Sequence, residues 1–268
     1  MMTSEAGLRR SLSLLRAFRL EQSDPDYFYR FQAADSMVQI ARYMDVAAKL
    51  VLDIGGGAGY FTEAFRARGA RCFLIEPEAG ASSIARSDPA APLTPAQERH
   101  RRAVAPARLV PESAVAGDGN CLPFPDGVAD VTFSSNVLEH VSDPARFLDE
   151  SVRVTRPGGL IYLSFTSWYS PWGGHETAPW HYFGGARAAR RYEALNGRPP
   201  GNLFGTSMYA THIGPVLRLA RSHRQVEVVS ASPRYYPDWM RWLIRVPGLR
   251  EVAAWNLLVI MRRRPAVR

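Results

Sequence analysis

A run of glycines beside one acidic residue is the feature of this sequence that most directly indicates chemistry. Residues 50–59 read LVLDIGGGAG, and the apolar stretch at their start predicts a buried strand. Aromatic and small residues then recur at helical spacing, at Tyr60, Phe61, Ala64 and Phe65. The glycines permit positive φ and let a ligand approach the backbone. Amides at the start of the helix can meet a polar or anionic ligand group, and Asp53 can accept a hydrogen bond or face a cation.

The spacing of these glycines separates two classes of ligand. A dinucleotide turn has the pattern G-x-G-x-x-G, and its third glycine would fall on Tyr60. The pattern present is D-x-G-x-G-x-G, formed by Asp53, Gly55, Gly57 and Gly59. It resembles motif I of the class I S-adenosylmethionine-dependent methyltransferases. The resemblance implies that these four residues bind the cofactor S-adenosylmethionine.

Two further segments match that family in order and spacing. A second short strand, 72–75, ends at Glu76, about twenty residues beyond the glycines, where an acid in this fold binds ribose hydroxyls. Residues 117–127 read GDGNCLPFPDG and resemble the family's D-x-x-x-L-P-F segment, in which the acid meets the adenine amino group. Asp118 takes that position. The resemblance therefore adds these cofactor-binding residues, together with one at the end of the next strand: Glu76, Asp118, Gly119, Asn120 and Ser135.

The rest of the core continues the alternation of strands and helices. A strand over 129–135 is followed by a loop over 136–141, and Asp143 and Pro144 predict the start of a helix that ends at 156–159. Strands are expected at 160–165, 225–230 and 255–261. The fold class is α/β: a Rossmann-like, doubly wound, mostly parallel seven-stranded sheet with an antiparallel last strand and a helical and loop cap. The resemblance covers residues 45–165 and is greatest to small-molecule and lipid enzymes of the ubiquinone-biosynthesis type, in a bacterial member.

The chain divides into a helical N-terminal cap at 1–45 and a methyltransferase domain at 46–268. Within that domain we expect a proline-rich insertion at 88–114, a substrate lid at 166–217 and a basic C-terminal part at 218–268. The lid is rich in aromatic residues and glycines and leaves the edge of the sheet at which ligands sit. The residues 21–29 are expected to form a turn with an aromatic cluster, before a helix that reaches about residue 44. Substrate contacts are predicted for Tyr29, Trp168, Trp172, His175 and Tyr182, with core packing as the alternative role of each aromatic residue.

Methyl transfer needs a general base only where the acceptor is a hydroxyl or a carbon acid. His140, on the loop after the fourth strand, is the first candidate, and His181 and His175 on the lid are the second. A backbone-bonded residue at the start of a helix is the alternative role of His140. Residues 175–181 lack the H-E-x-x-H spacing of zinc peptidases, so no metal is expected.

Charge is placed unevenly along the 268 residues. Residues 218–268 contain 11 arginines and 3 acidic residues, which accounts for the whole net charge of +8. The arginines alternate with tryptophan and tyrosine, as suits an anionic membrane surface. A solvated arginine-rich face is the alternative, and nucleic acid is not expected because the sequence has no recognised binding module. The two cysteines and the absence of a long apolar run fit a cytoplasmic protein, peripheral to the inner face of the membrane.

Three functions remain open. The first is methyl transfer to an apolar or lipid-like small molecule. The second is methyl transfer to a soluble metabolite or a macromolecule, and the third is a non-catalytic scaffold with this fold. Motifs identify the cofactor far better than the acceptor, so the methylated atom and the oligomeric state stay open.

Overall fold

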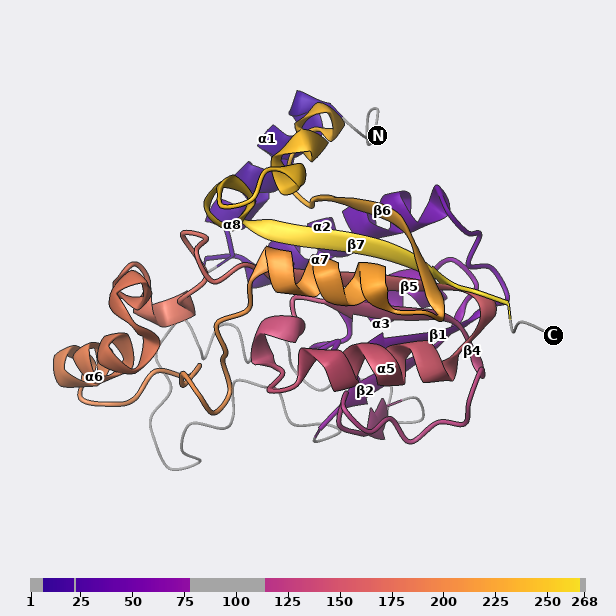
Figure 1. Cartoon of the computed structure of the whole chain (residues 1–268), viewed down its shortest axis with the longest axis horizontal. Coiled ribbons are helices and arrows are strands. Elements are labelled where there is room, and N and C mark those ends of the chain that lie inside the picture. The colour runs from indigo at the N-terminus through magenta and orange to yellow at the C-terminus, as the bar shows by residue number, and fades with distance from the viewer. Residues whose placement is uncertain (1–6, 22, 78–113, 266–268) are drawn as a thin grey trace.

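A computed structural model describes residues 7–21, 23–77 and 114–265 of the chain. Seven strands form one sheet in the order β3-β2-β1-β4-β5-β7-β6 (Figure 1). Strands β1 to β5 are parallel, and β7 runs antiparallel to both of its neighbours. The strands are β1 Leu50–Ile54, β2 Arg71–Glu76, β3 Ala114–Ala116, β4 Ala129–Ser135, β5 Thr155–Thr166, β6 Val226–Pro233 and β7 Asn256–Arg263. The mostly parallel seven-stranded sheet with an antiparallel last strand is confirmed.

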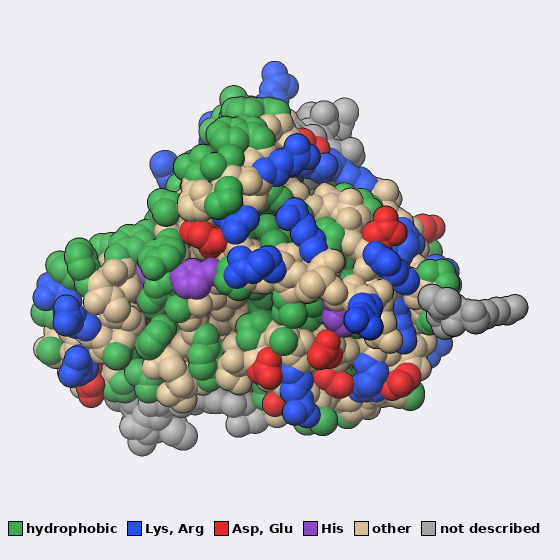
Figure 2. Space-filling view, viewed as in Figure 1, with side chains coloured by type: hydrophobic (Ala, Val, Ile, Leu, Met, Phe, Trp, Pro, Cys, Tyr) green, Lys and Arg blue, Asp and Glu red, His purple; other side chains and the backbone are tan. Residues whose placement is uncertain are grey.

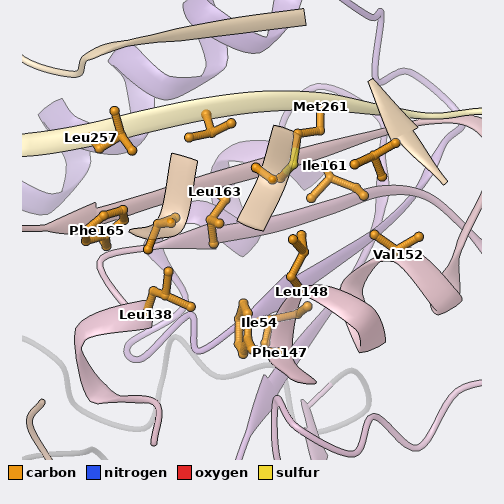
Figure 3. Packing of buried hydrophobic residues seen from close by; sticks show 14 of the residues in the cluster. Ile54, Leu138, Phe147, Leu148, Val152, Ile161, Leu163, Phe165, Leu257 and Met261 are labelled. Carbon is orange, nitrogen blue, oxygen red and sulfur yellow. The ribbon is translucent and has the colours of Figure 1, made fainter. Parts of the chain in front are cut away.

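Helices cover both faces of this sheet and so create two cores. Helices α5 (Pro144–Val154) and α7 (Ile213–Ser222) pack on one face, whereas α2 (Pro25–Ala41) and α3 (Tyr60–Arg66) pack on the other (Figure 1). Side chains along a strand point alternately to the two faces, so the apolar run of β7 serves both cores. Leu257, Val259 and Met261 join the core under α5, while Leu258 and Ile260 join the core under α2. Figure 3 shows the first of these cores.

The remaining elements lie around the sheet. Helix α1 (Leu8–Arg19) lies beside the segment that contains α8 (Leu249–Ala253), and α6 (Gly185–Asn196) projects from the left end of the molecule as viewed in Figure 1. The short 3-10 helices are η4 Leu138–His140, η5 His175–Thr177, η6 Trp180–Phe183 and η7 Asp238–Arg245. No helix among the described residues has both the length and the apolar character needed to cross a membrane.

Two boundaries differ from the sequence predictions. Helix α2 begins at Pro25, so the aromatic residues at 27–29 lie in a helix and not in a turn. The Asp24 side chain accepts a hydrogen bond from the Tyr27 amide at 3.1 Å and proline fills the first helical position, which is the same start signal that Asp143 and Pro144 give to α5. Residues 156–159 were predicted to end a helix, but β5 begins at Thr155 and includes them. The pairing of β5 with β4 is irregular at this point.

The structure describes two of the predicted segments, the N-terminal cap at 1–45 and the lid at 166–217, more fully than the insertion at 88–114. Helix α2 places Ala33, Met37 and Ile40 in the core against the sheet, and Tyr29 in its first turns packs against the same core. The insertion predicted at 88–114 lies, except for Ala114, outside the described residues. The segment 166–217 contains η5, η6 and α6, and is therefore folded.

Candidate functional site

A cavity of about 1790 Å³ opens at the carboxyl ends of β1, β2 and β4. Ligands in open α/β sheets bind at this edge. Pockets for one small ligand commonly measure about 300–1,000 Å³, so this cavity has room for two ligands side by side. Its wall is formed by the loops after these strands, by one side of α1 and α2, and by residues of the 166–217 segment.

The glycine turn after β1 forms one wall of the cavity. Gly55 and Gly57 have φ of +71° and +55°, which disfavours other residues. A Cβ atom at Gly55 would lie 2.5 Å from Cγ2 of Val137, and one at Gly56 would lie 2.4 Å from Oδ2 of Asp53. A Cβ at Gly57 would meet none of the described atoms within 4 Å, because this residue faces open space. The turn thus presents bare backbone to a ligand.

Two acidic residues lie beside the turn and line the cavity. Glu76, at the end of β2, accepts a hydrogen bond from the Gly57 amide through Oε1. Asp118 accepts one from the Asn120 amide at 2.8 Å, which folds the 117–120 loop toward the cavity. Gly119 lies so close to α5 that a Cβ there would be 2.5 Å from Cε2 of Phe147. Of the nine residues predicted to bind the cofactor, seven line the cavity: Gly55, Gly57, Glu76, Asp118, Gly119, Asn120 and Ser135.

The other two, Asp53 and Gly59, do not line the cavity. Gly59 caps the start of α3 with a φ of +80°. Asp53 is buried behind the turn, where its Oδ2 accepts a hydrogen bond from the Thr62 hydroxyl at 2.7 Å. Asp53 thus joins the turn to α3 from behind, and its contact with the cofactor stays a prediction. Burial raises the pKa of Asp53 to about 7, because the charged form loses its hydration.

This pKa predicts how stability depends on pH. Between about pH 4 and 7 the folded protein keeps a proton on Asp53 that the unfolded chain releases, so the free energy of unfolding should fall as pH rises. Asp53→Asn copies the protonated form and should remove this contribution, which amounts to at most about 1.4 kcal/mol per pH unit. Urea unfolding of both proteins across this range measures it. The exposed Asp45→Asn is the control, and parallel pH profiles for wild type and Asp53→Asn would contradict the prediction.

Three titratable side chains meet at the other end of the cavity. One ligand atom each of Glu139, His140 and His175 lies within 4.8 Å of the other two. The Nδ1 of His140 lies 2.7 Å from the carbonyl oxygen of Ser207, and since that oxygen only accepts, Nδ1 carries the proton and Nε2 is free to act as a base or ligand. Burial lowers the pKa of His175 to about 4, so its imidazole is neutral at physiological pH.

The residues predicted to contact the substrate divide into two groups. Tyr29, Trp172 and His175 line the cavity, and the Trp172 ring contacts Phe18 of α1 at 4.6 Å between centroids. Trp168 and Tyr182 do not line it, and neither does His181, the second candidate for the general base. His181 is fully buried inside the 166–217 segment, 5.1 Å from the Trp168 ring, and Tyr182 is exposed. His181 thus lies inside the segment and not at the cavity wall, and its catalytic role stays a prediction.

Two functional candidates were missed by the sequence predictions. Glu21 lines the cavity, and burial raises its pKa to about 7; no local pattern marks this acid, which stands in a polar stretch before α2. Arg234, at the end of β6, is 1% exposed. Its guanidinium donates to Ser135 and Ser164 at 2.9 and 2.8 Å through Nη1, and to Ser36 at 2.9 Å through Nη2. It therefore fixes the end of β4 where that strand meets the cavity.

Known proteins resemble this chain in sequence over most of its length. The profile of a family described as a methyltransferase domain matches residues 52–163. An uncharacterized methyltransferase of Mycobacteroides abscessus is 43% identical over 265 residues, 97% of this chain and 96% of that protein. One from Mycolicibacterium gilvum is 42% identical over 98% and 97% of the two chains. The crystal structure of an S-adenosylmethionine-dependent methyltransferase from Mesorhizobium loti is 18% identical, covers 86% of this chain and 98% of its own, and has a TM-score of 0.48.

Proposed function

The chain belongs to the S-adenosylmethionine-dependent methyltransferases, and we propose that its methyl acceptor is an apolar or lipid-like small molecule. The observation that carries this proposal is the mouth of the cavity. Leu8, Leu12 and Leu15 of α1 line the cavity and are also exposed to solvent, at 61%, 45% and 38%. An apolar path therefore leads from the surface into the site.

We propose that the donor binds along the glycine turn. The bare backbone at Gly55 and Gly57 would contact its polar amino acid part, Glu76 would accept hydrogen bonds from the ribose hydroxyls, and Asp118 would accept one from the adenine amino group. Three observations support these roles: the open space at Gly57, the lining positions of both acids and the hydrogen bond that ties Glu76 to the turn. Asn120 and Ser135 would complete the wall on this side.

The sulfonium of the donor supplies an already activated methyl group. The protein has to align an acceptor nucleophile with that methyl and exclude water, and such positioning can supply about 7–11 kcal/mol. Trp172 contacts both Phe18 of α1 and Trp255 near the start of β7, at 4.6 and 4.9 Å between ring centroids. We propose that this contact lets the 166–217 segment act as the lid of the domain. Where the acceptor carries a proton, that proton would be lost beside Glu139, His140 and His175, which line the cavity.

A membrane surface is the proposed source of the acceptor. Near the apolar face of α1, the segment that follows β6 exposes Trp239 at 69% and Trp242 at 45%. Arg9, Arg16, Arg19 and Arg245 are exposed in the same two segments. Figure 2 shows hydrophobic side chains gathered over α1 and α8, with Lys and Arg side chains below them. Exposed tryptophan and leucine with nearby arginine fit the interface of an anionic bilayer.

Much of the basic C-terminal part serves the fold, which refines the sequence prediction. Arg234 is buried, and Arg262, Arg263 and Arg264 donate to backbone carbonyl groups. The charge that could meet a membrane is therefore smaller than the sequence total, and the apolar side chains of α1 and η7 carry more of the proposed contact.

Co-sedimentation with lipid vesicles tests this surface. We expect the protein to bind vesicles that contain phosphatidylglycerol and to bind less well as salt rises. Exchanging both Trp239 and Trp242 for alanine should weaken binding at least about tenfold, because each ring loses its apolar contact with the bilayer. Leu195→Ala is the matched control, since Leu195 is 69% exposed but lies on α6, away from α1.

Transfer of labelled methyl groups tests the acceptor class. With S-adenosylmethionine labelled in the methyl group and a bacterial lipid extract, the label should pass into the organic phase, and the double tryptophan variant should slow this transfer. The proposal would be contradicted if the label appeared only in water-soluble products and the wild type did not bind vesicles. The acceptor would then be a soluble polar molecule.

A further inference from the structure

We propose that Glu139, His140 and His175 together bind a divalent transition-metal ion at the acceptor end of the cavity. The three side chains come from two segments, η4 and η5, which are more than 30 residues apart in the sequence. All three residues line the cavity, and their ligand atoms lie within 4.8 Å of one another. Metal–nitrogen and metal–oxygen bonds of about 2.0–2.2 Å would draw these ligand atoms closer together around the ion.

The donor set defines the class of ion. Two imidazole nitrogens and one carboxylate oxygen suit zinc, iron, cobalt or nickel, whereas magnesium and calcium prefer a shell of oxygen ligands. Three protein ligands also leave coordination positions open, as in catalytic metal sites. The composition of the cluster therefore favours a transition metal with room for an exogenous ligand.

Contacts behind the cluster orient two of its three ligands. The protonated Nδ1 of His140 donates to the carbonyl oxygen of Ser207, which leaves the unprotonated Nε2 as the nitrogen that can bind an ion. Oε1 of Glu139 accepts a hydrogen bond from the Thr166 amide at 3.0 Å. Metal-bound histidines and carboxylates typically have such outer partners, which fix the tautomer and the direction of the ligand atom.

A second observation points independently to a cation. Glu139 is only 3% exposed, and its Oε2 has no hydrogen-bond partner among the described residues. The buried Arg234 attracts this carboxylate through its charge, but the guanidinium donates its hydrogen bonds to serines and Asn136. A buried carboxylate oxygen without a hydrogen-bond partner is costly, and a bound cation would contact it directly.

The ion would act on the acceptor, and in this respect the inference rests on the proposed function. A hydroxyl oxygen of an otherwise apolar acceptor would occupy an open position, where the ion lowers its pKa. The proton passes to solvent, the oxygen forms a bond to the methyl carbon, and the bond from carbon to sulfur breaks with its electron pair kept by sulfur. The acceptor would therefore be an oxygen nucleophile.

Cobalt binding tests the site without any need for turnover. The tag-free, full-length protein is stripped of metal with a chelator and titrated with Co²⁺, and visible absorption reports the coordination. We expect saturation at one ion per chain. His175→Ala and Glu139→Gln should each weaken binding at least about tenfold, and Glu139→Gln keeps an oxygen that can accept from Thr166. His223→Ala is the matched control, because that histidine pairs with Asp149 on another part of the surface.

The outcomes separate this inference from the proposed function. Titration of the same variants with S-adenosylmethionine checks that they are folded and retain the donor site. Donor binding with no Co²⁺ binding, or Co²⁺ binding that His175→Ala leaves unchanged, overturns the metal site and leaves methyl transfer standing. Co²⁺ binding that depends on His175 supports the site even if no lipid acceptor is methylated.

Discussion

Exchanging Glu76 for alanine should weaken the binding of S-adenosylmethionine more than about 100-fold. A carboxylate that accepts hydrogen bonds from two ribose hydroxyls contributes about 1.5–3 kcal/mol through each, and each 1.4 kcal/mol corresponds to a tenfold change in affinity. The same change removes the bond to the Gly57 amide, which shapes the glycine turn. Isothermal titration calorimetry of the two proteins measures the effect.

Two further variants make this result specific. Glu76→Gln keeps an oxygen for the Gly57 amide but loses the charge, so its affinity should fall between wild type and Glu76→Ala. Glu193→Ala removes an exposed acid on α6 and should bind as the wild type does. Equal affinity of Glu76→Ala and wild type would show that Glu76 does not contact the donor.

Exchanging Arg234 for alanine should lower the free energy of unfolding by about 3–5 kcal/mol. The guanidinium is buried and donates to Ser36, Ser135 and Ser164, and Nη1 also lies 3.3 Å from Oδ1 of Asn136. Its removal leaves a cavity and several polar groups that are buried or partly buried without their donor, and each such loss is costly. The change also frees the end of β4, so donor affinity should fall together with stability.

Urea unfolding monitored by circular dichroism measures this effect. Arg234→Lys keeps the charge but not the planar set of donors, and should lose an intermediate amount of stability. Arg224→Ala is the matched control, since Arg224 is exposed and its loss should change stability by less than about 0.5 kcal/mol. If Arg234→Ala lost as little stability as Arg224→Ala, the hydrogen bonds of the buried guanidinium would not stabilise the end of β4.

Local chemistry explains why much of the fold could be predicted. The strand, glycine turn and helix at 50–66 are determined by residues adjacent in the sequence, as is the start of α5 at Asp143 and Pro144. The start of α2 carries the same acid and proline signal at Asp24 and Pro25. The aromatic residues that follow this signal predicted a turn with a cluster, and so the start of α2 was placed too late in the sequence prediction.

The missed parts of the site depend on contacts between distant segments. Arg234 belongs to a stretch whose arginines and aromatic residues predicted a surface, yet its neighbours are serines on α2, β4 and β5. His175 approaches His140 only because η5 folds back over the loop after β4, with ring centroids 5.1 Å apart. No spacing pattern in the sequence predicts this contact between His140 and His175. His181, only six residues further on, is directed into the segment instead.

Calorimetric titration of the purified protein with S-adenosylmethionine, with NADH as the control ligand, tests most directly the claim that the cavity beside the glycine turn is a methyl donor site. The account predicts that S-adenosylmethionine binds with one site per chain and that NADH does not bind, because the third glycine of a dinucleotide turn is replaced by Tyr60. Binding of NADH in its place, or no binding of S-adenosylmethionine by protein shown to be folded, would contradict it.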